Sequence, residues 1–483
     1  MTHSSLQPPT TLGKQASAMP PRRGASQQRA IRNRNCVMML FIISVVALLQ
    51  LAAAFSLTTV SSVRNMKNNI PTTPSPELRQ IQQRHRHIAA SFEVKEFIPH
   101  PALTNKHLQT IAGVFLRKNP DCAYMTDNGF TGLSKVLRAL SNMQSSEEVC
   151  NFWDERQRVT TSCGTDFYTV DVKYSGERKQ QFQSTESKGI VVLLHGLESN
   201  SNSSLSTDLG QAYVQDGFDV VCINFRGCCG LPNESLGGYH LGFTDDLLHF
   251  LQLIREQWET NYDFEKRPVY LSGFSLGANV VVKCLGELGE TAMSLYNVHG
   301  AAVVGAPFDA ERNIKQVDAP GFNRAIYSRN FLKSLKKRAQ YQLTTLCDDD
   351  PLTTLFDYKG VMAATTVAEF DDAAIAKIYG FEDRIDYYRS TSCYYYLPGV
   401  AIPLFIINAA DDPFFDPDFF PFEESVDGGS LAPIKMERTE YGGHIGYMFA
   451  LTDERLKVDR QVSWMPSELT RFLSHVHSFR EKK

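Results

Sequence analysis

The stretch Arg267-Pro-Val-Tyr-Leu-Ser-Gly-Phe-Ser-Leu-Gly-Ala-Asn-Val-Val-Val-Lys-Cys284 decides which fold this chain adopts. Its first part predicts a short buried strand directly after a proline, and its second part, from Leu276 onward, predicts an apolar helix. Between them, Gly273-Phe-Ser-Leu-Gly277 fits the pattern G-x-S-x-G, in which a strand turns into a helix within one or two residues. The two glycines leave no side chains to collide in that turn. The pattern therefore predicts that the Ser275 hydroxyl stands clear of a sheet, in the position of a nucleophile.

Length and composition limit the remaining possibilities only in part. The 483 residues suffice for two or three domains, or for one large α/β domain with insertions. The formal net charge of −4 gives no reason to expect a nucleic acid as a partner. The ten cysteines form no C-x-x-C pair, and no cluster of histidines and carboxylates has the spacing of metal ligands. We therefore expect no metal, no cofactor and no disulfide framework.

The N-terminal 60 residues differ in composition from the rest. Residues 1–35 are rich in Ser, Pro, Gln and Arg and predict a disordered basic segment. Residues 36–55 carry no charge and are long enough, as a helix, for a bilayer core of roughly 30 Å, so a transmembrane signal-anchor helix is predicted over 36–60. Since the arginines precede it, we expect a single-pass endomembrane protein with a cytosolic N-terminus. The alternative is a cleaved signal or organelle-targeting sequence, which places the protein in a secretory or organelle lumen.

The rest of the chain alternates buried strands with helices. Polar residues 61–91 predict a linker, and a folded domain is expected over 92–483. Amphipathic spacing predicts helices over 204–216, 247–258 and 469–479. Apolar or alternating runs predict strands near 167–174, 189–194, 218–225, 268–272, 298–305, 402–407 and 434–439. This order predicts an α/β fold with a doubly wound, mostly parallel sheet. Residues 308–396 interrupt it and predict a helical cap insertion over the site, whereas 117–160 predict an irregular surface insertion.

An activated serine needs a base within hydrogen-bond reach and a group that orients the base. In sheets that carry G-x-S-x-G the chain order is serine, acid, histidine, so only His444, His475 and His477 qualify. His475 and His477 lie in the terminal amphipathic segment and are expected to face solvent. His444 lies in the glycine-flanked loop Gly442-Gly-His-Ile-Gly446, directly after a predicted strand. We therefore predict His444 as the base.

The acid is expected where the strand ending at Ile407 runs into Asn408-Ala-Ala-Asp-Asp-Pro413. Asp412 stands directly before the proline that stops the strand. Its neighbour Asp411 is the alternative, and it points elsewhere if the backbone is extended. We prefer Asp412, whose carboxylate would hold the tautomer of the base and stabilise the imidazolium ion.

An oxyanion hole needs two backbone N–H groups aimed at the oxygen that becomes negative. Leu276, immediately after the serine, is expected to supply one. Leu197, in the loop His195-Gly-Leu-Glu-Ser199, is expected to supply the other because Gly196 lets the backbone fold closely. His195 itself is expected to brace this loop and not to carry a proton.

A second pair of residues invites a different interpretation. His240 and Asp245 fit an H-x4-D spacing that suggests acyl transfer. We prefer a structural role for the pair, in which its hydrogen bond holds the loop over 226–238.

These motifs together resemble the AB hydrolase 4 family of membrane-anchored α/β-hydrolase-domain esterases and lipases and related bacterial proteins. The resemblance spans roughly Phe92 to the C-terminus, and it departs from the family pattern at Phe405. The residues that carry it are Asn105–Thr110, His195-Gly196, Asn224–Cys228, Tyr239–Asp245, Gly273–Gly277, and, between Asp371 and Asp411-Asp412, the set Gly380-Phe381, Asp386-Tyr-Tyr388 and Ser392. The resemblance implies an α/β-hydrolase fold and a charge-relay triad of Ser275, Asp412 and His444. It also implies an N-terminal membrane anchor and activity on acylglycerols, phospholipids or short- to medium-chain esters.

Three functions fit these expectations. The first is a serine carboxylic-ester hydrolase that acts on lipid esters through an acyl-enzyme, because an anchor near lipid and an apolar cap favour an acyl-chain substrate. The second is an acyltransferase, in which an alcohol replaces water in the second step. The third is a non-catalytic binding protein on the same fold, against which the intact set of serine, acid and histidine argues.

Overall fold

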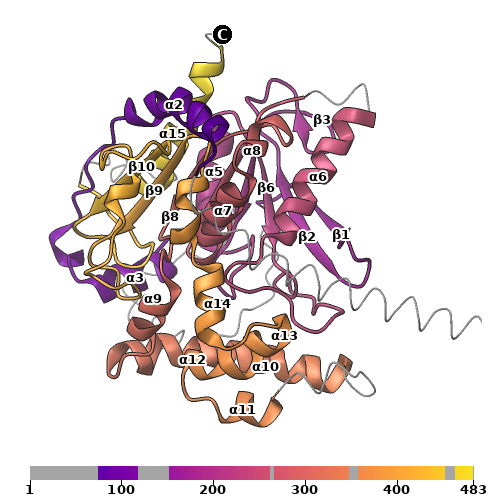
Figure 1. Cartoon of the computed structure of the whole chain (residues 1–483), viewed down its shortest axis with the longest axis vertical. Helices are drawn as coiled ribbons and strands as arrows, with labels where there is room; N and C mark the ends of the chain where they lie inside the picture. The colour runs from indigo at the N-terminus through magenta and orange to yellow at the C-terminus, as the bar shows by residue number, and fades with distance from the viewer. Residues whose placement is uncertain (1–73, 118–151, 261–265, 347–356, 452–462, 482–483) are drawn as a thin grey trace, which may run out of the picture. The chain divides into compact units, whose positions relative to one another are not determined.

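An eight-stranded sheet forms the centre of the described chain (Figure 1). The computed structural model describes residues 74–117, 152–260, 266–346, 357–451 and 463–481, all within the unit Met66–Lys483. Across the sheet the strands are β1 (Glu155–Thr160), β2 (Phe167–Lys173), β6 (Asp219–Asn224), β5 (Ile190–Leu194), β7 (Val269–Phe274), β8 (Val298–Val304), β9 (Leu404–Ala409) and β10 (Ile434–Thr439). A separate ladder pairs β3 (Arg178–Gln180) with β4 (Gln183–Ser184).

The six strands β6, β5, β7, β8, β9 and β10 are parallel to one another, and β2 runs antiparallel to both β1 and β6. This confirms the predicted α/β fold with a mostly parallel sheet. The prediction that 117–160 is irregular is wrong for β1. Its side chains alternate between half-buried and exposed, and its sequence Glu155-Arg-Gln-Arg-Val-Thr160 carries the charges that natural edge strands use against unwanted pairing.

Helices cover both faces of the sheet, so the central strands are apolar on both sides. The helices of this layer are α5 (Ser204–Gln215), α6 (Asp245–Thr260), α7 (Leu276–Leu288), α8 (Thr291–Ser294) and α15 (Trp464–Glu481). Along β5, Ile190, Val192 and Leu194 pack with α6 and α7, whereas Val191 and Leu193 pack with α5 and α15. All five are fully buried, which fixes the register of the strand that leads to the loop after Leu194.

The segment before the sheet is folded where a linker was predicted. Residues Pro76–Ala90 form helix α2, which begins at the cap residue Ser75 and docks on the domain through polar side chains. The amide of Gln82 donates to the carbonyls of Pro398 and Val400, at 2.8 and 2.9 Å. The linker predicted over 61–91 is therefore wrong for α2, because these polar side chains pair with domain carbonyls instead of facing solvent.

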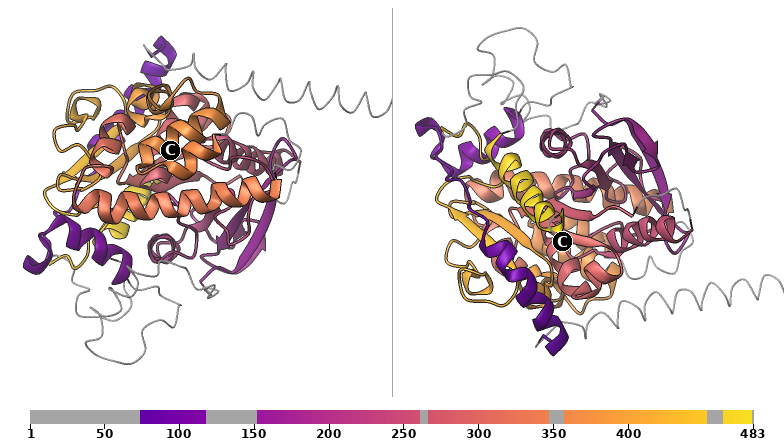
Figure 2. Two further views of the ribbon diagram at one scale, coloured as in Figure 1. Left: turned by 90° about the horizontal axis from the view of Figure 1, so that it is seen from below. Right: turned by 90° about the horizontal axis from the view of Figure 1, so that it is seen from above.

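The chain leaves the sheet between β8 and β9 and forms helices in the region where a cap was predicted (Figure 1). They are α9 (Ala310–Val317), η2 (Asn323–Ser328), α10 (Arg329–Leu346), α11 (Tyr358–Ala363), α12 (Val367–Phe370), η4 (Asp371–Ile375), α13 (Ala376–Tyr379), α14 (Arg384–Thr391) and η5 (Cys393–Gly399). Helix α10 crosses the lower face of the domain (Figure 2). Segments η2 and η4 are π-helices, a rare form that is enriched at functional sites.

Three short helices complete the described chain. They are η1 (Pro101–Leu103), α3 (Lys106–Phe115) and η6 (Phe422–Glu424). The predicted disordered segment 1–35 and anchor 36–60 lie outside the described residues, as does 118–151 of the predicted insertion. Among the residues that are described, no helix combines the length and the hydropathy needed to span a bilayer.

Candidate active site

Ser275 occupies the turn between β7 and α7, as G-x-S-x-G predicts. Its backbone has φ 54° and ψ −122°, a conformation that non-glycine residues rarely adopt. Backbone strain of this kind occurs mainly at functional sites. The glycines on either side permit close approach: a Cβ at Gly273 would lie 2.6 Å from the Gly277 carbonyl oxygen, and one at Gly277 would lie 2.4 Å from that of Leu194. The Ser275 side chain makes no capping bond to α7, so its hydroxyl remains available to a base.

The structure brings Ser275, His444 and Asp412 together from three distant parts of the chain. The Ser275 Oγ lies 2.9 Å from Nε2 of His444, and Nδ1 of the same ring lies 2.8 Å from Oδ2 of Asp412. A carboxylate accepts hydrogen bonds, so the neutral imidazole holds its proton on Nδ1 and presents the Nε2 lone pair to the serine hydroxyl. The Asp412 side chain is 1% exposed, and its second oxygen accepts the Phe414 N–H at 2.8 Å.

The two neighbouring aspartates have separate partners. Asp411 turns away from the imidazole and accepts the Gly443 N–H at 2.8 Å through Oδ1, while its Oδ2 has no hydrogen-bond partner in the described chain. Burial and, to a smaller extent, the adjacent charge of Asp412 raise the pKa of Asp411 to about 6. The geometry therefore gives Asp412 the contact with His444 and leaves Asp411 to hold the loop that carries it.

Residues before the sheet also hold the His444 loop, which the sequence alone did not reveal. Thr110 of α3 accepts the His444 N–H at 2.9 Å, and Gln109 bonds both the N–H and the carbonyl of Met448. The buried guanidinium of Arg117 donates to the Gly446 carbonyl at 2.5 Å. The motif Asn105–Thr110 contributed to the family resemblance, but the sequence assigned it no structural role. The structure shows that Gln109 and Thr110 of this motif hold the His444 loop in place.

Two aromatic rings flank the imidazole. Phe414 and Phe415 directly follow Asp412-Pro413, and their ring centroids lie 4.2 and 5.5 Å from that of His444. They pack on the ring while leaving its two nitrogens to Ser275 and Asp412. No spacing rule in the sequence singled them out, because a pair of phenylalanines after a proline is equally typical of an ordinary core.

The two residues predicted to supply the N–H groups of an oxyanion hole, Leu276 and Leu197, both line the cavity at Ser275. Leu276 is the first residue of α7, where helical N–H groups have no intrahelical partner. Leu197 lines the same cavity as Ser275, and a Cβ at Gly196 would lie 3.2 Å from the Ser275 Cβ. His195 lies behind the loop: its ring accepts the Phe225 N–H at 3.1 Å and donates to the Gly196 carbonyl at 2.8 Å. Burial lowers its pKa to about 4, so it is a neutral brace.

A cavity of about 190 Å³ opens from Ser275 and His444 toward the cap. At the roughly 30 Å³ that each molecule occupies in liquid water, it has room for about six water-sized groups. Its lining is mostly apolar and comes from the cap and the strand ends: Leu197, Leu241, Leu276, Pro307, Ala310, Ile314, Val317, Phe331, Leu335, Ala339, Val367, Phe370, Ala374, Ile375, Ile378, Phe414 and Phe415. A mostly apolar pocket of this kind can take up an apolar group next to the Ser275 hydroxyl.

The preferred role for His240 and Asp245 is wrong in its detail. Within the described chain no hydrogen bond joins them; His240 accepts the Gly242 N–H and its ring packs on Tyr379, with centroids 4.5 Å apart. Burial and, to a smaller extent, the charge of Lys283 lower the pKa of His240 to about 3, so the ring is neutral.

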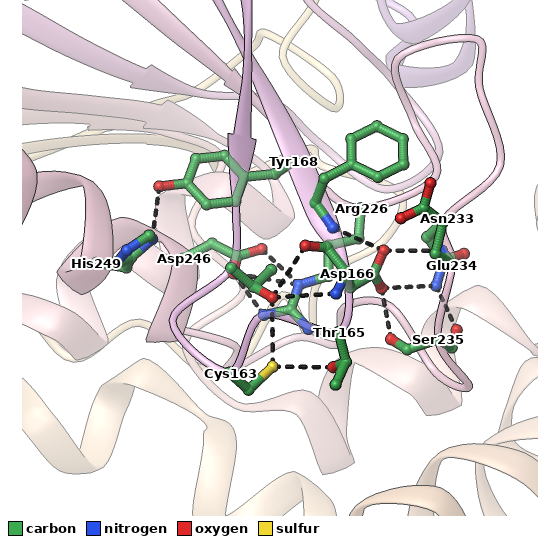
Figure 3. A network of polar contacts seen from close by, with 12 residues as sticks. Cys163, Thr165, Asp166, Tyr168, Arg226, Asn233, Glu234, Ser235, Asp246 and His249 are labelled. Atoms are coloured by element: carbon green, nitrogen blue, oxygen red, sulfur yellow. Dashed lines mark hydrogen bonds and ion pairs between the residues drawn. The ribbon is translucent and has the colours of Figure 1, made fainter.

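Other carboxylates hold the loop over 226–238 (Figure 3). Asp246 pairs with Arg226 at 2.6 Å, and Asp166 accepts the Glu234 N–H at 2.8 Å and the Asn233 amide at 3.1 Å. The loop that carries Gly237 and the following Tyr239 to the cavity is thus fixed from β2 and α6.

The two other candidate histidines lie far from Ser275, but they are not the solvent-facing groups expected. His475 bonds the Ile88 carbonyl at 3.0 Å, and His477 bonds the Tyr270 hydroxyl at 3.0 Å, with 12% of the His477 side chain exposed. Both belong to the packing of α15. Among the described residues, no group of three or more His, Cys, Asp or Glu side chains is arranged to hold a metal ion.

The sheet order, the strand–helix turn at Ser275 and the covering helices define an α/β hydrolase. The chain belongs to the alpha/beta hydrolase family, whose model matches residues 191–456. Its relatives include the Escherichia coli protein named putative esterase YheT, a member of the AB hydrolase 4 family, 34% identical over 58% of this chain and 75% of that protein. A monoacylglycerol lipase of Saccharomyces cerevisiae is 24% identical over 62% of this chain and 61% of that protein. The phospholipase ABHD3 of Mus musculus is 25% identical over 53% of this chain and 58% of that protein. The chain thus spans about three fifths of the two named lipases.

Proposed function

We propose that this hydrolase cleaves carboxylic esters of lipids, with Ser275 as nucleophile, His444 as general base and Asp412 as the group that orients the base. The single observation that carries the proposal is the pair of contacts at 2.9 and 2.8 Å that joins these side chains at the mouth of an apolar cavity. Acylglycerols, phospholipids and short- to medium-chain esters are the substrate classes that fit, and the names of the relatives support the same range.

The proposed reaction has two halves. Ser275 Oγ attacks the acyl carbonyl as Nε2 of His444 takes its proton, and the oxygen that becomes negative is stabilised by the N–H groups of Leu276 and Leu197. His444 then protonates the departing alcohol, which leaves an acyl group on Ser275. Water enters, His444 removes its proton, and the acid is released. Asp412 stays ionised throughout and holds the Nδ1 proton of the imidazole.

A fluorophosphonate probe tests the nucleophile. We expect the full-length protein to label at Ser275 and the variant Ser275→Ala not to label, with ester turnover lowered by about five to six orders of magnitude. Comparison of cellular lipids in cells that express either form should show one ester class accumulating with the variant. Equal labelling or equal turnover in the two proteins would assign the chemistry to another residue, and no labelling of the folded wild type would favour a binding protein.

Acyl transfer is the second candidate. One relative, from Saccharomyces cerevisiae, is named a medium-chain fatty acid ethyl ester synthase/esterase, and the mostly apolar cavity at Ser275 has room for an alcohol beside an acyl group. Added ethanol or glycerol would then compete with water for the acyl-enzyme. Product ratios measured with and without the alcohol separate the two reactions: a constant yield of free acid would exclude transfer.

The apolar run over 36–55 supports attachment to a membrane, with the N-terminus cytosolic. An anchored catalytic domain would meet lipid esters at the bilayer surface. Alkaline carbonate should leave the full chain in the membrane fraction and should release a chain that begins at residue 61. Release of both would favour a cleaved targeting sequence and a lumenal protein.

A further inference from the structure

Glu198 holds a backbone conformation that favours glycine. The chain turns back over residues 196–199, closed by the Ser199 N–H on the Gly196 carbonyl at 3.2 Å, and Glu198 is the third residue of this turn, with φ 54°. Glycine is the usual residue there, because a side chain at positive φ is strained. Such strain persists only where surrounding contacts offset it. The question is therefore which contacts hold Glu198.

Every oxygen of the Glu198 carboxylate is bonded by a group outside the turn. Oε1 lies 2.7 Å from the guanidinium of Arg338 and accepts the Tyr239 hydroxyl at 2.9 Å, and Oε2 accepts the Ser334 hydroxyl. The Glu198 N–H donates back to the Tyr239 oxygen at 2.8 Å. The Arg338 and Glu198 side chains are only 17% and 14% exposed, so the charges attract with little screening by solvent.

These contacts come from one face of a cap helix. Ser334, Arg338 and Gln342 are spaced four residues apart on α10, so they lie on one face. Arg338 also donates to the Arg226 carbonyl at 2.9 Å, and Gln342 donates to the Asn233 side chain at 2.9 Å. A polar stripe of the cap thus docks on the turn at Glu198 and on the loop over 226–238, beside the cavity that Ser275 lines.

The turn sets the direction of the Leu197 N–H. This N–H and the Gly196 carbonyl belong to one planar peptide and point in opposite directions. The carbonyl is held from behind by the Ser199 N–H and by the His195 ring, at 3.2 and 2.8 Å. The Leu197 N–H therefore faces the other way, and it keeps that direction only while the turn at Glu198 stays closed.

We propose that Glu198 is a positioning residue for the ester hydrolysis of the preceding section: clasped by Arg338 and Ser334 of the cap, its carboxylate keeps the Leu197 N–H aimed at the oxyanion. Transition-state stabilisation then depends on α10 being docked. This inference rests on the proposed function of Ser275. It differs from an ordinary ion pair between cap and core, which would affect stability and substrate affinity but not the reacting oxygen.

Two substitutions separate these roles. Glu198→Ala keeps the strain of the positive φ and removes the contacts that offset it; Glu198→Gln keeps the shape and removes the charge. We expect both to lower kcat on a p-nitrophenyl ester by about ten- to a hundredfold with KM within twofold, since removal of a whole oxyanion donor costs about a hundred- to a thousandfold. A trifluoromethyl ketone, which forms a tetrahedral oxyanion on Ser275, should bind more weakly by the same factor as kcat/KM falls.

Ser334→Ala provides an intermediate case, because it removes one hydrogen bond and keeps the ion pair; we expect kcat to fall about three- to tenfold. Lys337→Ala is the matched control on the exposed face of α10 and should leave all constants unchanged. Titration of Ser275 with a fluorophosphonate to completion corrects every rate for the fraction of folded protein. Unchanged kcat in both Glu198 variants, or a rise in KM alone, overturns the proposal. If the wild type shows no turnover that Ser275→Ala abolishes, the proposed function fails first, and the positioning role fails with it.

Discussion

Asp412 offers the sharpest test of the site, because both of its oxygens accept hydrogen bonds. Oδ2 accepts the Nδ1 proton of His444 and Oδ1 accepts the Phe414 N–H, each at 2.8 Å. Asparagine has one acceptor oxygen and one donor amide, so Asp412→Asn cannot satisfy both partners. The Phe414 N–H is a fixed backbone donor and takes the oxygen. The amide then faces His444 and forces the imidazole proton onto Nε2, where it cannot accept the proton of Ser275.

The size of the effect follows from this change of tautomer. In serine hydrolases, the same substitution lowers kcat by about four orders of magnitude, which corresponds to about 5 kcal/mol in the activation free energy. The 1% exposure of Asp412 leaves no room for water to replace the lost acceptor, so we expect a loss of about a thousand- to ten-thousandfold. The assay is kcat for a p-nitrophenyl ester, corrected by fluorophosphonate titration, with the melting temperature recorded for each protein.

The matched control is Asp411→Asn, which changes the neighbouring carboxylate in the same way. Its only hydrogen bond in the described chain is from the Gly443 N–H, and an asparagine oxygen can still accept it. We expect less than about a tenfold loss of kcat. A larger loss for Asp411→Asn than for Asp412→Asn would refute the assignment of the two aspartates and the tautomer argument together.

Three other predictions concern the cap and the packing around the site. Burial raises the pKa of Asp371 to about 7, so the folded protein keeps a proton that the unfolded chain loses near pH 4. The contribution of this group to the free energy of unfolding is therefore full below about pH 4 and falls by up to roughly 4 kcal/mol as the pH rises to 7. Asp371→Asn should flatten this pH dependence in melting temperatures measured from pH 4 to 8. Arg117→Met leaves Asp208 as a buried, unpaired charge and should lower the free energy of unfolding in urea by about 3–5 kcal/mol; a loss under 1 kcal/mol would show that the pair is solvated. Ala374→Leu fills part of the cavity and should lower the ratio of kcat/KM for fourteen-carbon over four-carbon esters by about tenfold or more, whereas an unchanged ratio would place the acyl chain elsewhere.

The mutual contacts of Ser275, Asp412 and His444 could be anticipated from the sequence because the positions of these residues follow from local rules. G-x-S-x-G requires a strand, a sharp turn and a helix in immediate succession, and the structure has β7, Ser275 and α7 in that order. The fixed chain order of serine, acid and histidine then left few choices for the base. The structure separates Asp411 from Asp412 by a turn, in which the Asp412 N–H donates to the Ala409 carbonyl at 3.3 Å, and not by the extended backbone that was considered.

Features that depend on distant parts of the chain could not be predicted in this way. The His444 loop is held by Thr110, more than 300 residues earlier, and nothing near either residue indicates the contact. Helix α2 has mostly polar residues, so its docking through Gln82 could not be separated from a solvated linker. Strand β1 lacks an apolar run because it lies at the sheet edge. Tertiary partners, which no local pattern records, decide all three.

The π-helix at Asp371–Ile375 has a consequence for how such caps diverge among relatives. A π turn contains one residue more than the α turn that it replaces. Loss of a single codon there would restore regular α-helix geometry with little rotation of the flanking turns, because the wider π turn already takes up the extra residue. The sheet and the Ser275 turn would be untouched. Loss of one residue at this place would therefore change the cavity wall locally, where Asp371, Ala374 and Ile375 line it, and leave the rest of the helices in place.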